Sequence, residues 1–97
     1  MIVNRRTFVI KRGCWQEAVA MVKAEQERLD PGAAFRLYTP NIAPFDILAM
    51  EWEYGSLEEY EKAWGDYSVS PEAAEFMERW YELTETGGTS EVWDLET

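Results

Sequence analysis

The pattern of apolar and polar positions in the first third of the chain predicts a strand followed by a helix. Residues 2–12 are rich in β-branched and aromatic side chains and lack a helical period, and Gly13 ends the run. Asp30-Pro31-Gly32 stops the segment that follows. Between these signals apolar residues recur every three or four positions, as on the buried face of a helix: Trp15, Ala18, Val19, Val22 and Leu29.

Two further strands are predicted in the middle of the chain. Residues 35–39 alternate between apolar and polar types, and residues 45–54 form a largely apolar run that needs cover on both faces. The proline-flanked residues 41–44 connect them. In the strand over residues 45–54, one face carries Leu48, Met50, Trp52 and Tyr54, and the other carries Ile47, Ala49, Glu51 and Glu53.

The last part of the chain predicts two helical segments and a closing strand. Ser56 and Glu59 form a capping box that starts the first helix. Residues 65–69 interrupt it, and Ser70-Pro71-Glu72 starts a second helix that runs to about Thr84. We expect Gly87-Gly88 to turn the chain into a strand over residues 89–96.

The element order βαββααβ predicts an α+β fold of ferredoxin-like type, in which a four-stranded antiparallel sheet carries all helices on one face. We expect residues 1–97 to form one domain. The other sheet face would mix apolar and charged residues, and such a face is seldom left in water. We therefore expect a homodimer that closes a dimeric α+β barrel through this open face. The residues assigned to it are Arg5, Thr7, Val9, Tyr38, Ile47, Ala49, Glu51 and Glu53.

The composition restricts the chemistry more than it identifies a function. The 97 residues include no histidine and a single cysteine, so an intrachain disulfide, a thiolate-rich metal site and the common histidine-based chemistries drop out. We expect no metal and no cofactor. Neither a signal peptide nor a membrane span is apparent, which favours a cytoplasmic protein. Fourteen aromatic residues supply large groups to bury in a core, an interface or a pocket.

The net charge of −10 is unevenly spread, with an excess of acidic residues only in the second half of the chain. Residues 1–48 carry seven basic against five acidic residues, and residues 49–97 carry two against fourteen. So acidic a surface repels phosphate groups, which argues against nucleic acid and anionic membranes as partners. A solvated acidic face is the simplest interpretation. An acidic protein-interaction module for a basic partner remains a weaker alternative.

The segment that contains the last two predicted helices is similar to part of a known protein family. The segment from Trp52 to Trp64, WEYGSLEEYEKAW, followed by Ser70-Pro-Glu-Ala-Ala-Glu-Phe-Met, is similar to strand three and helix two of NIPSNAP-like dimeric α+β barrel proteins. This superfamily includes antibiotic-biosynthesis monooxygenases and haem-degrading monooxygenases, which use an early Asn and a Trp in the second helical region. Asn4 and Trp64 fall at similar places. Haem degraders add a histidine that this chain lacks, which speaks against haem.

Glu51 and Glu53 form the second group of candidate residues. Their side chains share one strand face, where Arg5 of a neighbouring strand can meet them. Two such carboxylates can repel each other, which raises the pKa of one of them. That carboxylate could then act as a general base without histidine. The simpler interpretation, which we favour, is an ion-pair network with Arg5 or with a symmetry-related arginine. Cys14, near a helix start, is interpreted as a small packing residue rather than a nucleophile.

Two classes of function remain open. The first is a protein that binds a small aromatic or hydrophobic molecule in a pocket between the sheet and the helices. The second is a cofactor-independent monooxygenase that uses the same pocket, with Asn4, Trp64 and Glu51 as candidate catalytic residues. The candidate pocket residues are Arg5, Arg36, Tyr38, Glu51, Glu53 and Trp64.

Overall fold

The computed structural model describes residues 1–96, so the last residue of the expected domain, Thr97, lies outside the described part of the chain. Its elements follow the predicted order βαββααβ. They are β1 (Ile2–Ile10), α1 (Trp15–Leu29), β2 (Phe35–Tyr38), β3 (Ile47–Tyr54), α2 (Leu57–Ser68), α3 (Pro71–Leu83) and β4 (Thr84–Asp94).

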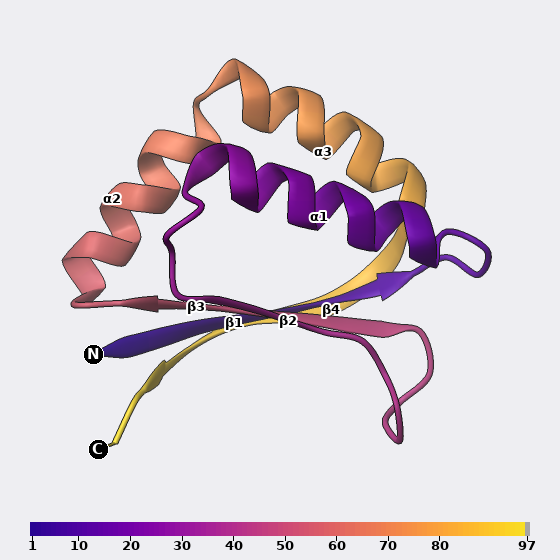
Figure 1. The fold of residues 1–97 in the computed structure, drawn as a ribbon, viewed down its shortest axis with the longest axis horizontal. Coiled ribbons are helices and arrows are strands. Elements are labelled where there is room, and N and C mark those ends of the chain that lie inside the picture. The colour runs from indigo at the N-terminus through magenta and orange to yellow at the C-terminus, as the bar shows by residue number, and fades with distance from the viewer. Residues whose placement is uncertain (97) are drawn as a thin grey trace.

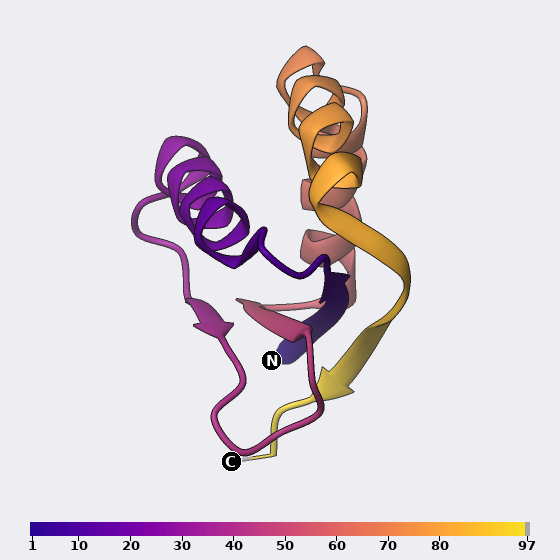
Figure 2. The ribbon, with the colours of Figure 1, turned by 90° about the vertical axis from the view of Figure 1, so that its right-hand side faces the viewer.

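The four strands form one antiparallel sheet in the order β2-β3-β1-β4. All three helices lie on one side of this sheet, as Figure 1 shows, and the view in Figure 2 separates α1 from α2 and α3 across it. Among residues 1–96, the opposite side carries no helix. These features confirm the predicted α+β, ferredoxin-like fold with its four-stranded antiparallel sheet.

The core lies between the sheet and the helices, on the face that the alternation in β3 predicts. Leu48 and Met50 of β3 pack there with Ile10 of β1 and with apolar residues of α1 and α3. Burying one large apolar side chain stabilises a fold by about 1.5–3 kcal/mol. Trp80, which is 1% exposed, is the largest fully buried side chain of the described residues. Trp80 lies near the C-terminal end of α3 and anchors that end of the helix in the core.

Capping residues set the start of α2 and α3. The Ser56 hydroxyl accepts a hydrogen bond from the Glu59 amide at 3.2 Å, and the Glu59 carboxylate accepts one from the Gly55 amide at 2.9 Å. The Ser70 hydroxyl accepts one from the Ala73 amide at 3.1 Å. Each cap satisfies a backbone N–H that the helix leaves without a partner. Both predicted helix starts are therefore confirmed.

The last strand begins earlier than the glycine pair indicates. β4 starts at Thr84, directly after α3, and Gly87 and Gly88 lie inside it. The pairing of β1 with β4 shifts there, so that residues 86–88 lie opposite Phe8 alone. Both glycines have positive φ, and a Cβ on Gly88 would lie 2.2 Å from the Thr7 carbonyl oxygen. The expected turn is thus a bulge within a continuous strand.

Other boundaries also differ from the sequence pattern. β3 begins at Ile47 rather than residue 45, because Asp46 has a φ of +64° and Phe45 is 86% exposed. α2 continues through the expected interruption to Ser68, because a glycine in the last turn of a helix costs only about 1 kcal/mol. Within residues 1–96, no helix is long and apolar enough to cross a membrane.

Candidate functional site

A cavity of about 450 Å³ lies between the helix-facing side of the sheet and the three helices. Seven aromatic residues and two methionines are among the residues of its wall. β1 and β3 supply alternate residues to it, with Glu53 as the exception, and α2 and α3 supply residues spaced three or four apart, so each element contributes mainly one face. The lining includes Arg6, Phe8, Glu25, Gln26, Met50, Trp52, Glu53, Tyr54, Ala63, Trp64, Tyr67, Phe76, Met77 and Trp80.

The aromatic rings of the wall contact one another edge to face. Trp64 packs against Trp52 with 5.9 Å between ring centroids and against Tyr67 with 5.7 Å, and both pairs are nearly perpendicular. On the α3 side, Trp80 contacts Phe8 edge to face and stacks on Phe76. Such pairs contribute about 0.5–1.5 kcal/mol each beyond their buried area, so they hold the wall in shape without a ligand.

Arg6 brings a positive charge into this aromatic wall. Its guanidinium carbon lies 3.5 Å from the centroid of the Trp64 ring, a cation–π arrangement. Nε donates to the Asn4 side-chain oxygen at 3.1 Å, and Nη2 lies 3.5 Å from the Tyr60 hydroxyl. The sequence analysis did not single out Arg6. The alternation of side chains along a strand could have indicated its position, because it places Arg5 and Arg6 on opposite faces of the sheet.

A second polar group lies where α1 meets α2. The Glu25 carboxylate accepts hydrogen bonds from the Tyr67 hydroxyl and from Arg28 Nε, both at 2.7 Å. Partial burial alone would raise the pKa of Glu25, but these two donors outweigh it and hold the pKa below its usual value. Burial and donation to Glu25 raise the pKa of Tyr67, which therefore stays a phenol. Nearby, Trp52 Nε1 donates to Gln26 Oε1 at 2.8 Å.

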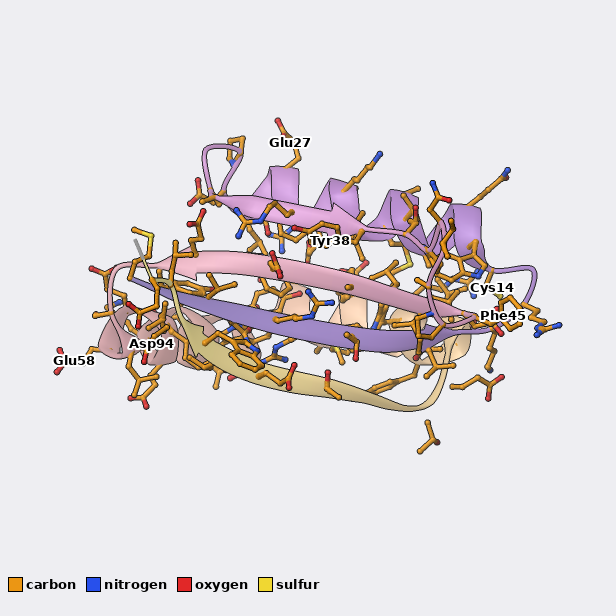
Figure 3. All side chains as sticks on the ribbon, turned by 90° about the horizontal axis from the view of Figure 1, so that it is seen from below. Cys14, Glu27, Tyr38, Phe45, Glu58 and Asp94 are labelled. Atoms are coloured by element: carbon orange, nitrogen blue, oxygen red, sulfur yellow. The ribbon has the colours of Figure 1, made fainter. Side chains whose placement is uncertain are left out.

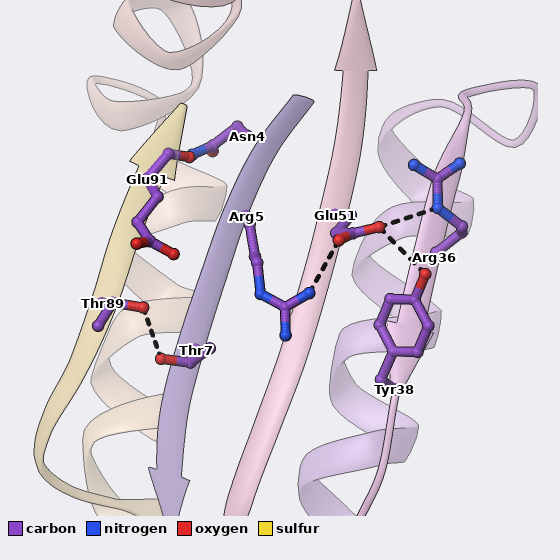
Figure 4. Close-up of polar contacts among 8 residues, drawn as sticks. All are labelled: Asn4, Arg5, Thr7, Arg36, Tyr38, Glu51, Thr89 and Glu91. Atoms are coloured by element: carbon purple, nitrogen blue, oxygen red, sulfur yellow. Dashed lines mark hydrogen bonds and ion pairs between the residues drawn. The ribbon is translucent and has the colours of Figure 1, made fainter. Parts of the chain in front are cut away.

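Most of the predicted pocket residues lie on the other side of the sheet (Figures 3 and 4). Arg5, Arg36, Tyr38 and Glu51 gather on the outer face, away from the cavity. The Glu51 carboxylate accepts hydrogen bonds from Arg5 at 2.9 Å and from Arg36 and Tyr38 at 3.0 Å. Arg36 also pairs with Glu53 at 3.0 Å.

Glu53 and Trp64 are the members of the predicted pocket set that line the cavity. The carboxylate of Glu53 is nevertheless held by Arg36, so the residue borders both sides of the sheet. The ion-pair interpretation of Glu51 accounts for its contacts. Burial would raise the pKa of Glu51, but the donors Arg36, Tyr38 and Arg5 outweigh it and lower the pKa. A low pKa is the opposite of what a general base formed by carboxylate repulsion requires.

Several solved structures with this fold are described as members of the families that the sequence resembles. A NIPSNAP family protein from Agrobacterium tumefaciens aligns with a TM-score of 0.81 and 23% identity, over 99% of this chain and 85% of its own. An uncharacterised NIPSNAP domain protein from Burkholderia xenovorans aligns at 0.83 and 17%, over 99% and 95%. The chain has the fold of these proteins.

A third structure, described as an antibiotic biosynthesis monooxygenase, aligns with a TM-score of 0.73 and 13% identity over the full length of both chains. The sequence itself matches no protein-family model and no curated protein. The expected resemblance to the NIPSNAP and monooxygenase structures is thus confirmed at the level of the fold. Folds of this kind host many functions, so the site has to be argued from its own residues.

The two residues that the monooxygenase resemblance singles out have different relations to the cavity. Trp64 lines it, and its indole Nε1 is buried with no hydrogen-bond acceptor among residues 1–96. Asn4 is fully buried behind Arg6, where its amide donates to the Glu91 carbonyl oxygen at 2.9 Å and lies 3.4 Å from the Ser90 hydroxyl. Asn4 therefore reaches the cavity only through Arg6.

Within residues 1–96, no three Asp, Glu or Cys side chains come together in an arrangement able to hold a metal ion. Cys14 precedes α1 and packs half-buried against the core. The chemical capacity of the cavity therefore rests on aromatic surface, one guanidinium and the phenols of Tyr54 and Tyr67. Burial raises the pKa of Tyr54, so this phenol too is neutral near pH 7. Such a wall suits binding and charge stabilisation.

Proposed function

We propose that the chain binds a small aromatic or hydrophobic molecule in the cavity between the sheet and the helices. The observation that carries the proposal is the aromatic lining of a cavity of about 450 Å³. Binding sites for small molecules have volumes of roughly 300–1,000 Å³, apolar walls and a few polar groups that fix orientation. Arg6, Gln26 and Tyr67 are polar groups of this kind.

The five tryptophans provide a direct test. Trp52, Trp64 and Trp80 line the cavity, whereas Trp15 and Trp93 do not. We expect titration with the neutral probe 2-naphthamide to shift the indole N–H resonances of the first three in ¹H–¹⁵N NMR spectra, with a Kd of roughly 10 µM to 1 mM for a ligand of this size. Equal shifts of all five resonances, or none at saturating probe, would overturn the proposal.

A pair of matched variants locates the binding event. Ala63 of α2 lines the cavity, and Ala74 of α3 is also an exposed helical alanine but does not line it. We expect Ala63→Trp to obstruct the cavity and to raise the Kd at least several-fold, and Ala74→Trp to leave it unchanged. Native mass spectrometry of freshly purified protein complements this test, because a molecule retained from the cell would appear as added mass.

Cofactor-independent oxygenation in the same cavity is the second candidate function. Trp64 and a cationic Arg6 in the wall support it, because an electron-rich phenol supplies its own electrons and the protein need only position it and stabilise the developing anion. Oxygen consumption with 1,5-dihydroxynaphthalene tests this idea. Activity above that of heat-denatured protein, and its loss in Trp64→Phe, would support oxygenation. Absence of activity leaves binding as the function.

We also propose that a second copy of this chain covers the outer sheet face. Tyr38 and Trp93 remain 44% and 58% exposed on the sheet, and the charges beside Tyr38, on Arg36 and Glu51, pair with each other on the same face. Paired faces would bury these rings and close a barrel. Analytical ultracentrifugation tests the proposal: a single 11.3 kDa species at micromolar concentration would refute it.

A further inference from the structure

Arg6 differs from the other arginines of the chain in what surrounds it. Of the six arginines, Arg5, Arg12, Arg28, Arg36 and Arg79 each lie within 4.0 Å of a carboxylate. Within residues 1–96, Arg6 has no such partner, although acidic residues outnumber basic ones by 19 to 9. A half-buried guanidinium without a counter-ion is therefore an exception in an acidic protein.

The groups that contact Arg6 are neutral and leave donors free. A guanidinium has five N–H donors in a planar fork. In the described structure Nε donates to Asn4 and one Nη2 hydrogen points toward Tyr60, while Trp64 covers one flat side. These contacts hold the side chain in place from one edge and one face. Arg6 itself lines the cavity, so its remaining N–H donors are available to a ligand there.

Both glutamates of the cavity wall are already paired with arginines. Of the lining carboxylates, Glu25 is bound by Arg28 at 2.7 Å and Glu53 by Arg36 at 3.0 Å. Asp30 is exposed at the C-terminal end of α1, where it accepts from the Gly32 amide. Arg6 is the one basic residue of the described cavity wall. Apart from Asp30 at its exposed edge, the wall thus presents one unpaired charge, the positive charge of Arg6 among aromatic rings.

From this arrangement we propose that the ligand is a planar aromatic monocarboxylate whose carboxylate binds Arg6 and whose ring lies among Trp64 and the other aromatic side chains. The inference rests on the proposed binding function and narrows its ligand class. The flat fork of a guanidinium matches the two oxygens of a carboxylate. A phosphate dianion is a poorer fit, because the wall offers one cation and the net charge of −10 repels a second negative charge.

Asn4 acts as the positioning residue in this proposal. Its amide nitrogen donates to the Glu91 carbonyl oxygen, which turns its oxygen toward Arg6. Asn4 is fully buried and does not line the cavity, so it acts on the ligand only through the orientation of the guanidinium.

The test compares two probes of nearly equal shape, 2-naphthoate and 2-naphthamide, by isothermal titration calorimetry at pH 7.5. We expect the wild-type protein to bind the anion more tightly than the amide. Arg6→Gln should weaken naphthoate binding by about tenfold or more and change naphthamide binding by less than about threefold, because only the anion loses a charge-assisted hydrogen bond. Arg6→Lys should keep part of the preference.

Arg12→Gln is the matched control, because it removes the same charge from an exposed position outside the cavity wall. We expect it to leave both affinities unchanged, and circular dichroism establishes that each variant is folded. If the wild-type protein binds the amide as tightly as the anion, or Arg6→Gln weakens both probes equally, the carboxylate inference fails and the proposed binding function stands. If neither probe binds, both fail.

Discussion

Replacing Glu51 by glutamine separates a structural ion pair from a general base. In the wild-type protein its carboxylate accepts from Arg5, Arg36 and Tyr38 at 2.9–3.0 Å. A glutamine keeps one oxygen and places an amide N–H₂ against a guanidinium, so at least one donor loses its acceptor. Hydrogen bonds to charged groups contribute about 1.5–3 kcal/mol when sheltered. Both arginine side chains are 42% exposed, and solvent reduces the expected loss to about 1–2 kcal/mol.

A loss of this size lowers the melting temperature by roughly 5–15 °C in a domain of this length. The effect should depend on pH. Because the folded-state pKa of Glu51 is lowered, its contribution is fully present above the unfolded pKa near 4.5 and is lost as the pH falls through the folded-state value. Thermal melts of wild type and Glu51→Gln should therefore differ at pH 7 and converge as the pH falls from about 5 toward 3.

Glu61→Gln is the control, because Glu61 lies exposed on α2 and makes no ion pair or side-chain hydrogen bond with any described residue. It should change stability by less than about 0.5 kcal/mol at either pH. A Glu51→Gln difference that stays constant or grows on acidification would refute the ion-pair reasoning and would favour a raised pKa. If a second copy covers the outer face, Glu51→Gln should also weaken dimerisation while naphthamide binding stays unchanged.

Three further predictions concern individual parts of the structure. Gly88→Ala should destabilise the fold by about 2–4 kcal/mol in chemical denaturation, because φ is positive and the new Cβ would lie 2.2 Å from the Thr7 carbonyl oxygen. Gly13 has a similar φ but open space around it, so Gly13→Ala should cost only about 1–2 kcal/mol. Ser70→Ala should cost about 1 kcal/mol through loss of the α3 cap. Tyr67→Phe should raise the pKa of Glu25, measured by carbon NMR, because a donor to the carboxylate is removed.

The sheet could be predicted from the sequence because its signals are local and repeated. Alternation along β3 separates Leu48 and Met50, which reach the core, from Glu51, which reaches the outer face. The pairing of Arg5 with Glu51 follows once β1 and β3 are neighbours, and the structure places them directly opposite each other. Each of these expectations depends only on the two-residue period of a strand and on opposite charges that share a face.

The glycine pair and the cavity could not be predicted in the same way. Gly87-Gly88 supplies positive φ values, and these fit a turn and a bulge equally well, so the choice depends on the partner strand. The cavity depends on how far α1 stands from α2 above the sheet. An aromatic side chain on a helix stripe, such as Trp64, can fill a core or line a pocket, and its spacing is the same in both cases.

The two adjacent arginines of β1 show how the same residue type acquires two roles. A strand directs neighbouring side chains to opposite faces, so Arg5 meets the carboxylate of Glu51 and Arg6 meets the ring of Trp64. In the outer cluster Arg5 and Arg36 face Glu51 and Glu53, and these charges cancel. On the inner face Arg6 has no carboxylate partner among the described residues, so its charge is available to the proposed ligand. For Arg6 to form an ion pair as Arg5 does, a carboxylate would have to lie beside it. The glutamates of the described cavity wall, Glu25 and Glu53, instead pair with Arg28 and Arg36.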